Sequence, residues 1–115
     1  NAEGVKIDGY LEMLDNQRIQ LGTGDDLHIY TDGSDSLIKH NGDGALRIYS
    51  GNAESIKCTE AGATHVFHNG SEKITTSATG ATLTGTLTIT ALPTSDPSAA
   101  GALWNDSGTV KVSAG

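Results

Sequence analysis

The sequence has little of what a lone globular domain uses to build a core. Hydrophobic residues make up 36% of its 115 residues and aromatic residues only 4%, whereas compact domains carry about 45–50% apolar residues. The apolar residues are nonetheless regularly spaced, which is not typical of a disordered chain. An ordered pattern with too few apolar residues predicts that the core is completed by other chains.

Other shortages exclude whole classes of function. The chain has only seven Lys and Arg residues against fourteen Asp and Glu, and these seven are spread along it, so a nucleic-acid partner is excluded because phosphate binding needs clustered basic residues. No apolar run approaches the roughly 20 residues of a membrane span, so membrane insertion is not expected. Cys58 is the only cysteine. It can form neither an intrachain disulfide nor a Cys-based zinc site within one chain, and we expect a small, half-buried hydrophobic residue there.

An internal repeat is the most informative feature that the chain does have. Each copy contains an alternating apolar run, a turn signal and a second apolar run, with a fainter first copy over residues 11–21. The turn positions stand 17, 18 and 19 residues apart, at Asn16, Gly33, Gly51 and Gly70. Repeats of this length predict a supersecondary unit that is used several times in succession.

Alternation with a period of two is typical of half-buried strands and not of helices. The runs are rich in strand-favouring residues such as Tyr30 and Tyr49. Asp32–Gly33 and Asn69–Gly70 supply the positive backbone φ angles of tight hairpin turns. We therefore predict an all-β protein built from units of about 18 residues, each holding two strands.

The composition divides the chain into three expected regions: a repeated shaft over residues 1–76, a Thr/Gly-rich stem over residues 77–92 and a hairpin tip over residues 93–115. In the stem, threonine alternates with small and aliphatic residues, which indicates extended β structure. Two prolines, Pro93 and Pro97, then interrupt any ladder. The tip is expected to be a short hairpin with Gly108 in the left-handed position of a bulged turn, and Trp104 is expected to close this end by packing.

Two stretches carry a likeness to a known family. One is the Leu-x-Ile-Tyr-x-Asp-Gly-Ser pattern at residues 27–34, echoed at residues 68–80, and the other is the closing segment at residues 92–113. Both resemble tail-fibre and related virion structural proteins of bacteriophages, particularly of marine phages. The resemblance implies a homotrimer with three chains about one long axis and a location on the virion beside other tail proteins. It also implies attachment to a glycan or protein receptor on the host surface.

Together, repeat and resemblance predict an elongated homotrimeric β-fibre, similar to a triple β-helix or β-prism, that ends in a short hairpin. The residues expected in the trimer core are Leu27, Ile29, Ile38, Leu46, Ile48, Ile56, Val66 and Ile74. Because loops commonly carry recognition, the exposed turns and the tip of the hairpin are expected to form the contact surface. The tip residues are Asn105, Asp106, Ser107 and Gly108.

The histidines suggest one site that only an assembly would complete. Residues two apart on a strand share a face, so His40 is expected on the face of Ile38 and His68 on the face of Val66. About a three-fold axis, each histidine would form a ring of three imidazoles, which can hold a metal or an anion. No other cofactor is expected. His65 and His68 are three apart and face opposite sides, so they do not form a pair on one chain.

No catalytic motif stands out, and we expect no enzymatic activity. The acidic residues from Asp25 to Asp43 fall in predicted turns, where Asp commonly serves turn chemistry in contact with solvent. Two alternatives stay open beside the fibre. One is a monomeric β-solenoid adhesin with a rung of about 18 residues, and the other is a glycan-cleaving tailspike segment, which would need a paired carboxylate site.

Overall fold

A computed structural model describes residues 4–115 of the chain. The all-β prediction is confirmed, because the described residues form ten strands and no helix. It follows that no helix in this part of the chain is suited to crossing a membrane. The chain divides into two compact units, one ending at Thr84 and the other running from Gly85 to Gly115.

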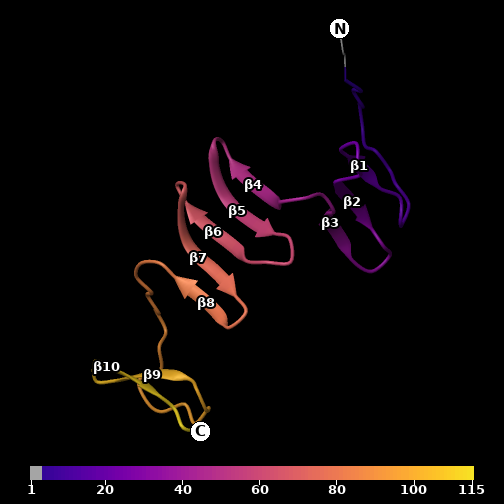
Figure 1. The fold of residues 1–115 in the computed structure, drawn as a ribbon. Coiled ribbons are helices and arrows are strands. Elements are labelled where there is room, and N and C mark those ends of the chain that lie inside the picture. Colours follow the sequence, from indigo (N-terminus) through magenta and orange to yellow (C-terminus); the bar gives the residue numbers. More distant parts are fainter. Residues whose placement is uncertain (1–3) are drawn as a thin grey trace. The chain divides into compact units, whose positions relative to one another are not determined.

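The first unit contains two antiparallel sheets whose strands follow one another in chain order (Figure 1). The three-stranded sheet contains β1 (Ile19–Leu21), β2 (Leu27–Thr31) and β3 (Ser36–His40). The five-stranded sheet contains β4 (Ala45–Ser50), β5 (Ala53–Thr59), β6 (Thr64–His68), β7 (Ser71–Ser77) and β8 (Gly80–Leu83). Within each sheet, neighbouring strands are joined by hairpins and run antiparallel. These strands therefore differ from a parallel β-helix, which stacks successive rungs in parallel.

The turns are formed by residues with left-handed backbone angles. Between β6 and β7, Asn69 and Gly70 have φ angles of 49° and 77°, as in the two-residue type I′ turn whose twist matches that of the flanking strands. Gly51 has a φ of 61° at the first position of the turn between β4 and β5. Positive φ angles also occur at Asn16 and Gly33, so all four repeated turn positions adopt a conformation that favours glycine or asparagine.

The sequence repeat is also a repeat of strand register. The pairing of β4 with β5 shifts between Ile48 and Tyr49, and the pairing of β6 with β7 shifts between Val66 and Phe67. These two positions lie 18 residues apart. A register shift of this kind is a β-bulge, which strengthens the local twist of the strands. Two successive repeats thus place equivalent residues in equivalent geometry.

The faint first copy is only half formed. Residues 4–18 make no strand, and the expected second run contributes only the short β1. The chain turns at Asn16, whose backbone N–H donates to the carbonyl oxygen of Thr31 at 2.7 Å. The expected first run, Leu11–Leu14, therefore has no neighbouring strand to pair with.

The expected stem does not form one continuous strand region in the single chain. Its first part belongs to the five-stranded sheet as the end of β7 and the whole of β8, and residues 84–92 form no strand. The boundary between the two units falls after Thr84, inside the segment. A strand needs a partner for its backbone N–H and C=O groups, and the single chain supplies none to residues 85–89.

The second unit is a hairpin of β9 (Leu103–Asp106) and β10 (Thr109–Val112). Its turn differs from the expected bulged turn of four residues, because Asp106 pairs with Thr109 and only Ser107 and Gly108 lie between the strands. Both turn residues have positive φ angles, 53° and 96°, so a type I′ turn joins the strands and no bulge residue is needed.

Polar contacts close this second unit around Ser113, which is only 3% exposed. Its hydroxyl donates to Oδ1 of Asp96 at 2.5 Å. Its backbone N–H donates to Ala102 and its carbonyl oxygen accepts from Gly101. The N–H of Ser98 also donates to Asp96 Oδ1, at 2.9 Å. The unit is thus tied together by hydrogen bonds and not by an apolar core.

No apolar side chain among the described residues is buried in the single chain. The only buried residues there are polar, His28 and Ser113. Because burial of apolar surface is the main favourable term in folding, the described residues of the single chain lack the contribution that usually dominates stability.

Candidate functional site

A row of aliphatic side chains crosses the whole five-stranded sheet. Ile48 pairs with Ile56, Ile56 with Val66, Val66 with Ile74, and Ile74 with Leu83. Directly opposed residues of antiparallel strands point to the same side of a sheet, so these five side chains share one face. Neighbouring strands lie about 4.8 Å apart, so the row spans about 19 Å.

The three-stranded sheet repeats this arrangement. Ile19 pairs with Ile29, and Ile29 pairs with Ile38, so one isoleucine of each strand lies on the same side of this sheet. Every strand of the first unit therefore contributes one aliphatic residue to a row. We call the side of the two sheets that carries these rows the aliphatic face. Its apolar members are Ile19, Leu21, Leu27, Ile29, Ile38, Leu46, Ile48, Ile56, Cys58, Val66, Ile74 and Leu83.

All eight residues expected in the trimer core lie on the aliphatic face, four of them in the row of the five-stranded sheet. Ile19, Leu21, Cys58 and Leu83 were not expected there. The register of the hairpin between β7 and β8 places Leu83 opposite Ile74 and therefore on this face, but the threonine-rich composition assigned the residue to a separate stem. Cys58 pairs with Leu46 and with Thr64, which places the free thiol beside the row.

The aliphatic face is open in the single chain. Exposed fractions run from 38% for Val66 to 63% for Ile38 among its exposed members. The chain exposes 9019 Å² of accessible surface, whereas a compact monomer of 11.8 kDa exposes about 5,900 Å². The difference between the two areas is about 3,100 Å². Two standard interfaces would bury less surface on one chain, since each buries about 800 Å² per partner.

The opposite face of the five-stranded sheet carries two pairs of ionisable side chains. The Arg47 guanidinium lies 3.1 Å from a carboxylate oxygen of Glu54, and His65 Nδ1 lies 2.5 Å from one of Glu72. The second pair stands 18 residues after the first. A hydrogen bond with Tyr49, and then the charge of Glu54, raise the pKa of Arg47. The sheet is therefore amphipathic, with its charges directed away from the aliphatic face.

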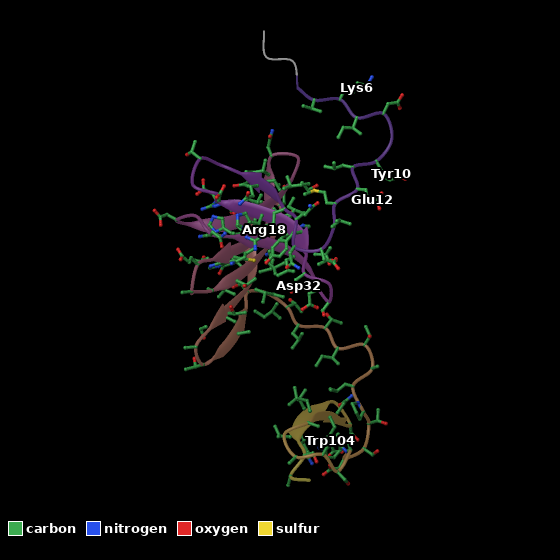
Figure 2. The ribbon with its side chains drawn as sticks, turned by 90° about the vertical axis from the view of Figure 1, so that its right-hand side faces the viewer. Lys6, Tyr10, Glu12, Arg18, Asp32 and Trp104 are labelled. Atoms are coloured by element: carbon green, nitrogen blue, oxygen red, sulfur yellow. The ribbon has the colours of Figure 1, made fainter. Side chains whose placement is uncertain are left out.

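The polar face of the three-stranded sheet contains the one buried histidine, His28, which is 5% exposed. Its Nε2 lies 3.2 Å from the side-chain amide of Gln20, and its Nδ1 lies 3.3 Å from that of Asn41. Nearby, the Arg18 guanidinium stands 4.8 Å above the centre of the Tyr30 ring, and Figure 2 shows Arg18 against this sheet. These contacts position side chains within the fold.

The two candidate axial histidines occupy different environments. His40 pairs with Leu27 on the aliphatic face and is half-buried. His68 pairs with Ser71 at the end of β6 and is exposed. Within residues 4–115, no three His, Cys, Asp or Glu side chains of one chain are grouped so that they could hold a metal. An axial ion would depend on ligands from several copies.

The side chains of two of the four expected tip residues, Asn105 and Asp106, make contacts inside the hairpin. Oδ1 of Asn105 accepts from the N–H of Gly108 at 2.7 Å. Asp106 forms an ion pair with Lys111, whose ammonium group lies 5.4 Å from the centre of the Trp104 ring. Only Ser107 and Gly108 are exposed at the tip.

The surface hollows differ in the side chains that line them. One is lined by small residues without a titratable group, Ala61, Gly62, Ala63, Thr76, Ser77 and Ala78. Another is lined by Lys39, His40, Cys58 and Glu60 together with Ile38, Leu46, Thr59 and Ala61. In the turn after β2, Asp32 accepts backbone N–H bonds from Asp35 and Ser34, which lower the pKa of this carboxyl group. The Asp32 carboxylate thus serves a turn.

Comparison with known proteins identifies no relative: no family model, curated protein or solved structure matches the chain.

Proposed function

We propose that this chain is a structural, non-catalytic segment that assembles with two identical copies into a β-fibre. One observation carries the proposal. Every strand of the first unit presents an aliphatic residue on one face, yet no apolar side chain of the described residues is buried. Burying such a side chain contributes about 1.5–3 kcal/mol, so covering this face is the largest stabilisation still open to the chain.

A second copy of the same chain is the occupant that best fits this face. The row itself carries no charge, while ion pairs such as Arg47–Glu54 lie on the opposite face. Extended strands in antiparallel sheets with one apolar side suit a β-prism, in which three sheets turn that side toward a common axis. Antiparallel hairpins support this arrangement over a triple β-helix.

The number of copies rests on the resemblance to phage fibre proteins, since two sheets packed face to face about 10 Å apart would also cover the row. Sedimentation or native mass spectrometry of the full chain decides the question. We expect three times the chain mass of 11.8 kDa at micromolar concentration. A dimer would refute the three-fold prism, and a monomer with the same ordered strands would refute the assembly altogether.

The biological role proposed for this fibre is attachment of a virion to its host. Location in the tail, neighbouring tail proteins and a host glycan or protein receptor all follow from the resemblance. A trimer presents three copies of each exposed turn, and several weak contacts sum to firm attachment. Binding of fluorescently labelled trimer to bacterial cells tests this role, and it should be lost when the same chain is made monomeric.

The axial ion stays part of this proposal. In a trimer about the aliphatic face, His40 of each copy would contribute one imidazole to a ring of three, because it shares that face with Ile38. Metal analysis of purified, chelator-washed trimer provides the test. Metal at one ion per three chains supports the ring, and its absence refutes it.

A further inference from the structure

The segment Thr84–Thr90, which follows the five-stranded sheet, has the sequence of a strand. Threonine occupies every even position from 82 to 90, while Leu83, Leu87 and Ile89 occupy odd positions. β-branched residues favour strands, and alternation with a period of two is typical of a strand with one covered side. The amino-acid pattern is at least as strand-like here as in β8.

Beyond Thr84, the single chain offers this segment no backbone partner. The N–H of Thr84 donates to the carbonyl oxygen of Lys73 at 2.8 Å, which is the last ladder bond at the end of β8. Among the described residues, no backbone hydrogen bond involves residues 85–89, and Figure 1 draws them as plain ribbon between β8 and β9. Leu87 and Ile89 are 66% and 45% exposed. A strand-forming sequence is thus left with neither a partner nor apolar cover.

We infer that Thr84–Thr90 is an intermolecular strand, which pairs in parallel and in register with the same segment of the neighbouring copies. The inference rests on the proposed assembly. Unpaired strand edges are templates for pairing with another chain. Rotational symmetry places identical residues of the copies at the same level along the axis, so the partner available to this segment is itself.

The alternation sets the sides of this strand. Leu87 and Ile89 lie two residues apart and so share one side of an extended segment. The bend at Gly85, whose φ is 123°, separates this side from that of Leu83 in β8. In the proposed assembly, the neighbouring copies cover this apolar side. The threonine hydroxyls then lie on the other side, where water satisfies them.

Disulfide trapping tests the pairing directly. In a Cys58→Ser parent, Thr88→Cys places one thiol on each copy of the segment. In-register strands lie about 4.8 Å apart, within the Cα separation of about 4.4–6.8 Å that a disulfide needs. We expect most Thr88→Cys chains to form covalent dimers on mild oxidation. The matched control, Thr94→Cys beyond Pro93, should stay uncrosslinked.

Hydrogen exchange of the unaltered protein gives a second readout that needs no substitution. Residues 85–89 should exchange at least about 100-fold more slowly in the assembly than in dissociated chains, because ladder formation protects amides. An assembled protein that neither crosslinks at position 88 nor protects residues 85–89 would overturn the inference and leave the proposed function standing. A parent chain that stays monomeric would overturn both.

Discussion

The five-stranded sheet and the C-terminal hairpin unit are held together by different kinds of contact. In the sheet, five strands pair through backbone ladders while the aliphatic row on one side stays open. In the hairpin unit, polar contacts fold the segment back on itself, and Ser113 is buried between Asp96, Ala102 and Gly101. The sheet thus leaves its apolar side chains uncovered in the single chain, whereas the hairpin unit finds its polar partners within the chain.

In the repeated strands, the backbone hydrogen bonds are satisfied within the chain while the apolar side chains stay uncovered. Backbone hydrogen bonds are satisfied locally by hairpins, because each strand has its partner only a few residues away. The aliphatic residues on one side of a single sheet layer cannot form a closed core, since a sheet must bury its apolar face against another layer. Changes in the two regions should therefore affect different measurements.

The largest effect is expected from a charge on the aliphatic row. Ile48→Asp should abolish the trimer, with association at least about 100-fold weaker, because assembly would bury a carboxylate without a partner. Ile29→Asp in the other sheet should do the same. Sedimentation measures the mass. Ile48 is 48% exposed in the single chain, so circular dichroism should still report strands.

Lys57→Asp is the matched control for that experiment. Position 57 pairs with Arg47 and His65 on the polar face, so the same carboxylate there should leave the trimer intact. A trimeric Ile48→Asp variant would contradict the proposed interface, and so would equal losses from the substitutions at positions 48 and 57.

A smaller effect is expected from the same substitution in a turn of each region. Gly70 and Gly108 have φ angles of 77° and 96°, and a Cβ at either position would meet no atom within 4 Å. Alanine at each therefore introduces only left-handed backbone strain, about 1 kcal/mol. Gly70→Ala should lower the thermal stability of the sheet, and Gly108→Ala should loosen only the hairpin, as followed by amide exchange in each region. Asn69→Gly is the control, because glycine also accepts a positive φ.

The smallest effect is expected from pH on the hairpin unit. The Ser113 hydroxyl, and then the Ser98 N–H, lower the pKa of Asp96 below the ordinary value of 3.8. A depressed carboxyl pKa contributes stability that is present above the ordinary value and is lost as the pH falls through the lowered one. Amide exchange near Ser113 should therefore accelerate below about pH 4. Asp96→Asn should remove this pH dependence, and an unchanged pH profile in that variant would contradict the role of Asp96.

Much of the fold could be predicted from local patterns. The period of two placed all eight expected core residues on one face, and turn chemistry located the hairpins at Gly33, Gly51 and Gly70. The tip was predicted less well: Asn105 and Asp106 belong to β9, because two consecutive left-handed residues at Ser107 and Gly108 make a tighter turn than a bulged one. The absence of a strand at residues 84–92 could not be predicted, since propensity does not reveal whether a partner strand exists.

The class of structure, the strand phase and the turns follow from local sequence, because each depends on residues within one hairpin. The alignment of residues across the sheets follows from the folded structure alone. Register joins Ile48, Ile56, Val66, Ile74 and Leu83 into one row, and it brings Arg47 within 3.1 Å of Glu54 on the other side. These alignments depend on bulges and loop lengths summed over several hairpins, and a shift of one residue in any of them would reverse a strand's faces.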